Sequence, residues 1–542
     1  MTLARALLLL CVVGVAKADQ TKCFSAAGKQ GPCGPDRQLC GPNFGATAPQ
    51  YHIHSGTCSM NDPNGPVYDP VYGFYHMFYQ DHLAIPNDGA GRGPVYGHAV
   101  SRDLTMWARL PVAIWNDRPY DSAAIFTGSA TVVNGKVMQI YPGICDKKQW
   151  DNCVTGTNFN LAVPADPDND PLYHNWTKYW GNPIVNNTQR DPSTAWQTPY
   201  GEWRLTSYDT TTYGSKDFKS WYVVGKNSDF PQGECPSFFP FPRVVDKVKD
   251  PPNVRFPTHV HKASIEGKDW MQVGTWSDGK PGETGSFAPT PSFDFNRQII
   301  DSGNFYASKD LYDPLQQRRI NYGWARVSPG STLSLPREIL WSQKMKQLLY
   351  VPLREQEALR KDIIVSFKDK QVEGFFATGN NKQLKQAESN VIFEIPKTPG
   401  TLGIVAFAGS SPTSTDGIFF YVNITRATLA CMLGPEDALC NATVGAVGKS
   451  LNFTDVLKLS AGDKTLSFRI FTDQTFAECY WQGGRVAMTA NNPQQLDKAT
   501  VGENLAIRAE FKEGVLVQEM NVWSVSSIWV SPKHVLNTPR PK

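Results

Sequence analysis

The chain has 542 residues, with 53 Lys and Arg against 50 Asp and Glu and a formal net charge of +3. This near balance, without a basic run interleaved with aromatic residues, argues against a nucleic-acid groove. The length would allow three or four average domains, although β architectures often use roughly 200 residues or more in one.

The first element along the chain is a secretion signal. Residues 1–18 carry Arg5, an apolar run from Ala6 to Val15 and small residues before Asp19, which predicts a cleaved signal peptide. The run is too short to span a bilayer, which takes about 20 apolar residues, and no other segment is long and apolar enough. We therefore expect a soluble protein with no membrane partner, secreted or delivered to a vacuole-like compartment.

Cysteine spacing and glycosylation sequons fit an oxidising destination. A cysteine-rich segment covers residues 19–50, and the pairs Cys145 with Cys153 and Cys431 with Cys440 could close small disulfide loops. None of the spacings is the Cys-x-x-Cys of a metal site. Sequons occur at five asparagines, which are Asn175, Asn186, Asn423, Asn441 and Asn452.

Three short acidic motifs stand far apart in the chain: MNDPNG at 60–65, QRDP at 189–192 and GECP at 233–236. Each alone is a weak signal, since Asp-Pro-Asn-Gly is also a good β-turn. Together they offer the carboxylates that cleavage of a glycosidic bond with retention requires. One acid attacks the sugar and a second, protonated acid assists the leaving oxygen. The third could hold the sugar.

In their order along the chain, and in the segments that accompany them, these motifs resemble those of glycoside hydrolase family 32, the invertase, fructan hydrolase and fructosyltransferase family. The similarity runs from about residue 51 to 360 and includes further segments, which are 78–80, 97–101, 127–131, 191–196, 304–309 and 335–338. The resemblance implies a five-bladed β-propeller over residues 51–345, a linker at 346–365 and a C-terminal β-sandwich over 366–542.

Residue patterns independently favour an all-β chain. Short alternating runs bounded by Gly, Pro, Asn and Asp recur throughout, and the best helical candidate is the short stretch at 353–361. A seven-residue pattern that begins at Ser101 returns at Ser215, 114 residues later, with a partial third copy at Ser308. Two units of 57 residues suit four-stranded propeller blades with long loops.

The resemblance also assigns roles to the acids. Asp62 is expected to be the nucleophile that forms a covalent fructosyl-enzyme, Glu234 the acid/base, and Asp191 the group that binds fructose hydroxyls and stabilises the transition state. Arg190 could orient Asp191 and balance its charge. This chemistry requires Glu234 to be protonated near the working pH while Asp62 is ionised.

Further substrate contacts follow from matching family positions. Asn61 and Gln80 are expected to reach the fructose hydroxyls, and Phe126 is expected either to line the pocket or to pack in the core.

The chemistry needs no cofactor and no metal. His52 with His54, and His259 with His261, would each lie on one face of a strand, but no carboxylate cluster accompanies them. We interpret them as strand or pocket residues.

Two departures from the family concern the donor sugar. Ser59 stands where the family usually has tryptophan. Ser277 stands where plant invertase-like members place an acid that, with a lysine matching Lys280, grips the glucose of sucrose. Asp278 could serve instead if the loop shifts by one residue, so we expect Asp278 and Lys280 to contact substrate.

These observations predict a secreted β-fructofuranosidase that hydrolyses sucrose. Fructosyl transfer and fructan hydrolysis are close alternatives, because water or another sugar can attack the same intermediate, and the barriers differ by roughly 1–3 kcal/mol. An inactive sugar-binding propeller is the alternative from another class, and the presence of all three acids argues against it. The expected partner is sucrose or a fructan; the sequence leaves the oligomeric state open.

Overall fold

The computed structural model describes residues 47–56, 59–82, 93–145, 153, 156–246, 257–290, 298–409, 417–491 and 503–541. The expected signal peptide, most of the cysteine-rich segment and Cys58 lie outside these residues. Within the described part, no helix is long and apolar enough to cross a membrane.

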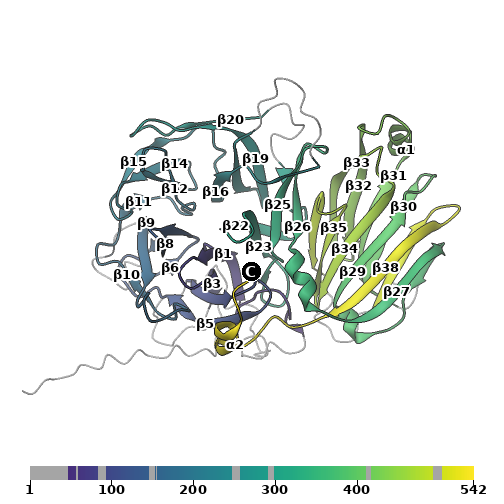
Figure 1. The fold of residues 1–542 in the computed structure, drawn as a ribbon, viewed down its shortest axis with the longest axis horizontal. Helices are drawn as coiled ribbons and strands as arrows, with labels where there is room; N and C mark the ends of the chain where they lie inside the picture. The colour runs from purple at the N-terminus through teal and green to yellow at the C-terminus, as the bar shows by residue number, and fades with distance from the viewer. Residues whose placement is uncertain are drawn as a thin grey trace, which may run out of the picture.

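Five sheets follow one another along the chain and surround a common centre as the blades of a propeller (Figure 1). The first sheet contains β1 (Ser59–Pro63), β2 (Val67–Asp69), β3 (Phe74–His82), β4 (Val95–Ser101) and β5 (Trp107–Ile114). The second contains β6 (Ala124–Ile125), β7 (Ser129–Val133), β8 (Lys136–Ile144), β9 (Thr157–Pro164), β10 (Trp176–Lys178) and β11 (Val185–Thr188). The third contains β12 (Trp196–Gln197), β13 (Trp203–Thr206), β14 (Thr211–Ser215) and β15 (Trp221–Lys226).

The last two blades are built in the same way. The fourth contains β16 (Glu234–Pro240), β18 (His259–Ile265), β19 (Lys268–Ser277), β20 (Ser286–Pro289) and β21 (Gln298–Ile299). The fifth contains β17 (Val244–Val245), β22 (Phe305–Asp313), β23 (Arg318–Ala325), β24 (Thr332–Leu333), β25 (Arg337–Ser342) and β26 (Gln347–Pro352). Neighbouring strands pair antiparallel, except for β17, which runs parallel to β25. Each blade presents its first long strand or loop to the centre.

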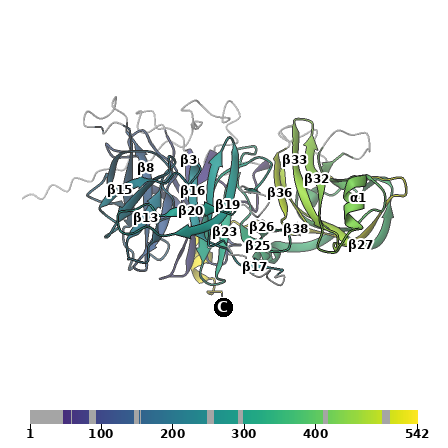
Figure 2. The ribbon, with the colours of Figure 1, turned by 90° about the horizontal axis from the view of Figure 1, so that it is seen from above.

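Two six-stranded sheets form a sandwich beside the propeller (Figure 2). One contains β27 (Arg360–Val372), β38 (Val515–Val525), β29 (Gln386–Glu394), β34 (Thr465–Asp473), β35 (Phe476–Trp481) and β36 (Val486–Asn491). The other contains β28 (Gly374–Ala377), β37 (Asn504–Glu510), β30 (Gly400–Ala408), β31 (Ile418–Ile424), β32 (Leu439–Gly448) and β33 (Leu451–Ser460). Alternate residues of both sheets meet in one apolar core. The predicted all-β fold, a five-bladed propeller followed by a sandwich, is thereby confirmed.

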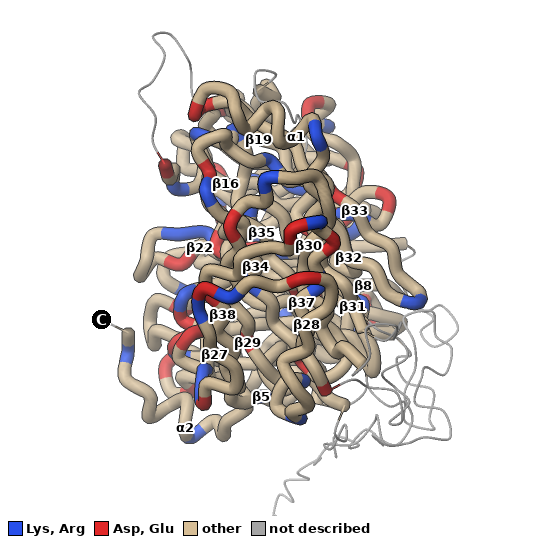
Figure 3. The backbone as a smooth tube through the Cα atoms, turned by 90° about the vertical axis from the view of Figure 1, so that its right-hand side faces the viewer, with Lys and Arg blue, Asp and Glu red and all other residues tan. Residues whose placement is uncertain are grey.

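Helices are few and short in the described part of the chain. They are the 3-10 helices η3 (Arg354–Leu359) and η4 (Lys382–Lys385) and the α-helices α1 (Arg426–Met432) and α2 (Pro532–Asn537). Both short disulfides considered from sequence, Cys145–Cys153 and Cys431–Cys440, are formed. On the face shown in Figure 3, Lys and Arg alternate with Asp and Glu over the sandwich, in agreement with the small net charge.

The ends of the two domains differ from the expected boundaries. The fifth blade continues through β26 to Pro352, and the sandwich begins with β27 at Arg360, so only η3 and its flanking residues connect them. Beyond Val525 the chain leaves the sandwich and returns to the first blade. There Trp529 forms a β-bridge with Trp107, and α2 buries Val535 against the blade. The apolar side chains of this tail explain why it packs on the propeller.

The repeated sequence pattern is a repeated turn. Ser101 ends β4 of blade one and Ser215 ends β14 of blade three, and each hydroxyl accepts a hydrogen bond from the amide three residues later (2.9 Å in both). Leu104 and Phe218, at that amide, both have positive φ, of 66° and 64°. The two copies are therefore two blades apart, as the spacing predicts. The partial copy at Ser308 is different, because it lies inside strand β22 and forms no such turn.

A buried ionic network fastens the sandwich to the propeller. Arg337 of the fifth blade donates to Asp301 Oδ2 (2.8 Å) and to Glu478 Oε2 (3.1 Å) of the sandwich. His52, which precedes the first blade, lies 2.8 Å from Asp473 Oδ2 and 3.4 Å from Glu478 Oε1. All five side chains are excluded from solvent. Because a buried charge is costly without its partner, this network makes the two domains depend on each other.

The charge of His52 makes this contact sensitive to pH. Burial alone would lower the pKa of His52, but the hydrogen bonds and charges of Asp473 and Glu478 outweigh burial and raise the pKa to about 9. In the unfolded chain the pKa lies near 6.5. The stabilisation is therefore complete below pH 6.5 and is lost as the pH rises to about 9.

We expect the free energy of unfolding to fall by about 3 kcal/mol between pH 6.5 and 9 in the wild type, and by much less in His52→Gln. Denaturant titrations across this range measure the difference. His534→Gln, which removes an exposed histidine of α2, is the control and should follow the wild type. Equal pH dependence in His52→Gln and the wild type would contradict a charged His52.

Candidate active site

The three acids of the sequence motifs meet at one end of the propeller axis. Asp62 lies in β1, Asp191 in the loop before β12, and Glu234 at the start of β16, so each comes from a different blade. Arg190 Nη2 donates to Glu234 Oε1 (2.6 Å), and Arg190 Nε lies 3.8 Å from Asp191 Oδ2. Cys235 links the other two, with its Sγ 3.5 Å from Asp62 Oδ2 and 3.9 Å from Asp191 Oδ2.

Irregular backbone aims these side chains at the centre. The strand register shifts between Met60 and Pro63 in β1 and between Glu234 and Ser237 in β16, as at a β-bulge. Asp191 and Cys235 have positive φ angles of 61° and 49°, a region that costs free energy for residues other than glycine. The Cys235 amide donates to Asp191 Oδ2 at 3.0 Å, which holds the two unusual conformations together.

Asp62 is surrounded by hydrogen-bond donors. Its Oδ1 accepts from Asn61 Nδ2 (2.9 Å), and its Oδ2 accepts from Thr127 Oγ1 (2.5 Å) and Gln80 Nε2 (3.4 Å). Burial raises the pKa of Asp62, and the charge of Glu234 adds to this, while Thr127, Asn61 and Cys235 partly oppose the shift. The carboxylate is thus oriented at both oxygens, and among the described residues it forms no ion pair.

Asp191 is the more strongly perturbed acid. It is 3 % exposed, and burial together with the negative charge of Asp62 raises its pKa to about 7. The Cys235 amide, Lys309 and Arg190 act in the opposite direction. Burial and both carboxylates also raise the pKa of the Cys235 thiol well above its usual range, so the thiol keeps its proton and donates it.

Glu234 is accessible to solvent, with about a third of its side chain exposed. Arg190 binds one carboxylate oxygen, and the Tyr306 hydroxyl donates to the other, Oε2, at 2.7 Å. Burial and Glu234 raise the pKa of Tyr306, so this hydroxyl remains a donor. The Arg190 guanidinium also lies 4.3 Å from the centre of the Tyr208 ring, which limits its movement.

Four of the residues expected to bind substrate lie at this end. Arg190 is described above, and Asn61 also donates to Gln80 Oε1 at 3.0 Å, so the two amides form one unit beside Asp62. Gln80 Nε2 donates to Thr127 Oγ1 at 2.6 Å. Phe126 directly precedes Thr127 and is partly exposed, a position that allows contact with a bound molecule.

Asp278 and Lys280 do not lie at the acid end, which corrects the expectation for both. Glu234 pairs with Ser264 at one end of the fourth blade, and Pro240 pairs with His259, which pairs with Gly274, towards the other end. Asp278 and Lys280 lie in the loop that follows β19, beyond Gly274. Along strands that rise about 3.3 Å per residue, this loop is roughly 30 Å from the level of Glu234.

The β18–β19 turn occupies the acid end instead. Its two central residues, Glu266 and Gly267, both have positive φ, as in a tight two-residue hairpin turn. Arg326 Nη2 donates to Gly267 O (3.1 Å), and its guanidinium lies 5.4 Å from the Tyr306 ring, whose hydroxyl binds Glu234. The exposed carboxylate of Glu266 is therefore held on the side of the acid cluster where Glu234 lies.

The histidine pairs belong to other parts of the structure. His52 is in the interdomain network, and His54 contacts Arg109. His259 and His261 stack on Phe238 and Phe230. In the part of the chain that the structure describes, no group of three or more His, Cys, Asp or Glu residues could hold a metal ion.

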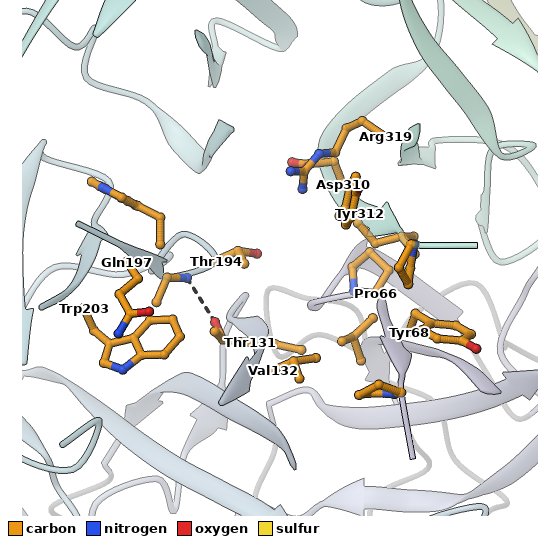
Figure 4. Close-up of a pocket in the computed structure, with 17 residues that line it drawn as sticks. Pro66, Tyr68, Thr131, Val132, Thr194, Gln197, Trp203, Asp310, Tyr312 and Arg319 are labelled. Atoms are coloured by element: carbon orange, nitrogen blue, oxygen red, sulfur yellow. Dashed lines mark hydrogen bonds and ion pairs between the residues drawn. The ribbon is translucent and has the colours of Figure 1, made fainter. Parts of the chain in front are cut away.

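A cavity of about 410 Å³ lies at the opposite end of the axis from the acids (Figure 4). The inner segments of four blades run from the acid cluster to this cavity. In blade one the chain passes from Asp62 to Tyr68, and in blade five from Tyr306 to Tyr312; blades two and three contribute 130–132 and 194–197.

Sequence reasoning missed several residues around the acids. Thr127, Tyr306 and Lys309 lie in segments that were noted only for their resemblance to the family, and Cys235 was noted only as part of a motif. Their position in the chain is a usable signal, because each lies in the segment of its blade that faces the propeller axis, close to an acid or to a residue that binds one.

Comparison with known proteins establishes the family. Residues 52–352 match the model of the glycosyl hydrolases family 32 N-terminal domain. The chain is 31% identical to an acid beta-fructofuranosidase of Vicia faba (89% of this chain, 82% of the relative) and 30% identical to one of Vigna radiata (89% and 80%). The chain therefore belongs to glycosyl hydrolase family 32.

Solved structures share the whole fold. Fructan 1-exohydrolase IIa of Cichorium intybus superposes with a TM-score of 0.72 at 24% identity, covering 90% of this chain and 98% of that one. A family 32 beta-fructofuranosidase of Bombyx mori superposes with a TM-score of 0.62 at 19% identity, covering 92% and 97%.

The raised pKa of Asp191 predicts a gain of stability on its removal. Between pH 4 and 7 the folded state holds a proton that the unfolded chain releases, so stability falls as the pH rises through this range. We expect Asp191→Asn to raise the free energy of unfolding by roughly 2–4 kcal/mol above pH 7, and to have little effect near pH 3. Thermal unfolding at several pH values measures this.

Asp362→Asn, at an exposed position of β27, is the matched control and should leave the melting temperature unchanged. A loss of stability in Asp191→Asn at pH 8 would show that the carboxylate is not strained by burial and by Asp62.

Proposed function

We propose that this chain is a retaining β-fructofuranosidase that hydrolyses sucrose, with Asp62 as nucleophile, Glu234 as acid/base and Asp191 as the stabiliser of the transition state. The observation that carries the proposal is the arrangement of the acids. Three carboxylates from three blades are joined by Arg190 and Cys235 at one end of the axis. The two quoted relatives are named acid beta-fructofuranosidases, which supports the same activity.

The differences between the acids support their roles. Asp62 Oδ2 accepts from Thr127 and Gln80 and lies nearest the thiol. Among the described residues Oδ1 accepts from Asn61 alone, so Oδ1 is the freer oxygen for attack. About a third of the Glu234 side chain is exposed, so Glu234 can exchange protons with a leaving sugar and with water, while Arg190 and Tyr306 orient its two oxygens.

The reaction then proceeds in two balanced steps. Asp62 attacks the anomeric carbon of the fructosyl unit; the bond to the glycosidic oxygen breaks, and that oxygen takes the proton of Glu234 and leaves as glucose. Water next attacks the same carbon and gives its proton to Glu234, and the bond to Asp62 breaks to release fructose. Asp191 faces the positive charge that develops on the fructose ring in both steps.

On the leaving-group side we assign Glu266 in place of Asp278. The turn that carries Glu266 reaches Glu234 through Arg326 and Tyr306. An exposed carboxylate there can accept hydrogen bonds from glucose hydroxyls. Asn61, Gln80, Phe126 and Arg190 are left for the fructosyl unit, because they surround Asp62 and Asp191.

Fructan hydrolysis and fructosyl transfer are alternative outcomes on the same scaffold. A structural relative from Cichorium intybus is named a fructan 1-exohydrolase and has been solved with 1-kestose, which supports a fructan as second substrate. The complete set of acids argues against an inactive sugar-binding propeller. So does the raised pKa of Asp191, because a buried carboxylate that destabilises the folded state is costly to keep in a protein that only binds sugar.

We also propose that the protein works outside the cytosol, in the extracellular space or a vacuole. Two disulfides and four exposed sequon asparagines, which are Asn175, Asn186, Asn441 and Asn452, support this destination. Relatives include a vacuolar and an insoluble isoenzyme.

The activity is tested by following free glucose and free fructose together during incubation with sucrose. Hydrolysis predicts equal release, and transfer predicts an excess of glucose with new oligosaccharides. Glu234→Gln should lower kcat by about 10²–10⁴-fold and Asp62→Ala should abolish turnover, with melting temperatures close to the wild type. Near-normal rates in either variant would contradict the roles assigned here.

The leaving-group assignment is tested by two matched substitutions. Glu266→Gln should raise KM for sucrose roughly tenfold, because a hydrogen bond to a charged group is lost. Asp278→Asn should leave both kcat and KM unchanged, because it lies at the far end of the fourth blade. The opposite pattern would restore Asp278 to the substrate site and remove Glu266 from it.

A further inference from the structure

Lys309 is a buried lysine that lies beneath the acid cluster. Lys309 is part of β22, three residues after Tyr306, and is 2 % exposed. Its Nζ donates to Ser129 Oγ (3.1 Å), Pro192 O (3.3 Å) and Pro236 O (3.1 Å). One ammonium from the fifth blade therefore contacts the inner segments of the second, third and fourth blades.

The three acceptors belong to the segments that carry the acids and their partners. Ser129 follows Thr127 by two residues, Pro192 follows Asp191 directly, and Pro236 follows Glu234 by two residues. Ser129 Oγ also donates to Pro192 O (2.8 Å), so its lone pairs are free to accept from the ammonium. Carbonyl groups that face the axis need a donor, because a buried acceptor without one is costly. Lys309 donates to Pro236 O and adds a second donor to Pro192 O, which already accepts from Ser129.

The positive charge of Lys309 also acts on the acid cluster. In the described part of the chain Lys309 forms no ion pair of its own, whereas the neighbouring buried lysine, Lys262, pairs with Asp269 at 3.1 Å. Asp310, the next residue, pairs with Arg319 on the side of the far cavity (Figure 4). The titratable groups that face the Lys309 ammonium are Asp191, Cys235, Lys262 and Asp310. The Cys235 thiol stays protonated and Asp310 pairs with Arg319. Among these groups, Asp191 therefore carries the negative charge that the Lys309 ammonium can balance.

We propose that Lys309 is a positioning residue for the reaction: its ammonium fixes the inner segments of three blades beneath the acids and favours the ionised form of Asp191. The kinetic part of this proposal rests on the proposed function; the electrostatic part does not. Burial lowers the pKa of Lys309, but donation to three oxygens uses three N–H bonds, which the ammonium has and the neutral amine lacks. Its positive charge opposes the rise in the pKa of Asp191.

The electrostatic part is tested by thermal unfolding without any substrate. The difference in melting temperature between a protein and its Asp191→Asn partner, followed from pH 4 to 9, reports the pKa of Asp191 in that background. We expect this pKa to rise by roughly one pH unit in Lys309→Met, which removes the charge and keeps much of the volume. Lys309→Gln, which keeps a donor but no charge, should show the same rise. An unshifted pKa in both backgrounds would overturn the electrostatic part.

The positioning part is tested by steady-state kinetics on sucrose. Lys309→Met should lower kcat by about 10–100-fold with KM nearly unchanged, because misplaced groups weaken transition-state contacts more than ground-state ones. Lys309→Gln should recover part of kcat, since its amide can still donate. The control is Lys458→Met, which removes another buried lysine that donates to a carbonyl, Met345 O (3.3 Å), away from the acids.

Three results separate the possibilities. Loss of kcat with the shifted pKa supports the proposal, and wild-type kcat in Lys309→Met with a melting temperature lowered as in Lys458→Met overturns it in favour of a purely structural lysine. If Lys309→Met does not fold, Lys309→Gln gives the same two readouts. If the wild type itself does not act on sucrose, the proposed function fails, while the thermal titration still decides whether Lys309 acts on Asp191.

Discussion

Asp62 and Asp191 share one buried site, and the repulsion between them is the constraint around which the acid end of the propeller is built. Water would screen two such charges, but here burial and the partner carboxylate raise the pKa of Asp191 to about 7. The surroundings offset this cost with hydrogen-bond donors. The Cys235 amide and thiol, Thr127 and Arg190 all point at carboxylate oxygens. Such groups are arranged before substrate arrives, which is how a protein stabilises charge that develops in a reaction.

The architecture explains how these groups can be kept in place. A propeller brings the inner segments of successive blades side by side, so residues 62, 191 and 234 become neighbours although they are far apart in sequence. Bulges in β1 and β16 and the left-handed backbone at Asp191 and Cys235 store strain at that end. The strain is held by the packed blades and by the sandwich, which is fastened through His52, Arg337 and Glu478. The returning C-terminal tail, with Trp529 on Trp107, closes the first blade as well.

Much of the fold and of the acid site could be predicted from sequence, and the failures have physical reasons. The turn that repeats at Ser101 and Ser215 is local, so its pattern gives the correct spacing of two blades. The residues around Ser308 are similar, yet they form a strand, because sheet pairing overrides a local turn preference.

The expectation for Asp278 was wrong because residue spacing does not tell which end of a strand pair faces the acids. Only the register, with Glu234 beside Ser264, shows that the turn at Glu266 lies there. Lys309 escaped notice because a lysine in a strand is usually at the surface.

We propose that Asp62 forms a covalent bond to the fructosyl unit during turnover. The most direct test is rapid acid quenching of the protein during turnover of sucrose, followed by proteolysis and mass spectrometry of the peptide that contains Asp62. We expect a transient mass increase of one fructosyl unit on Asp62 in the wild type and none in Asp62→Ala. In Glu234→Gln the adduct should accumulate from a substrate whose leaving group needs no protonation. A fructosyl unit on another residue, or turnover of that substrate by Glu234→Gln with no adduct, would show that Asp62 is not the nucleophile.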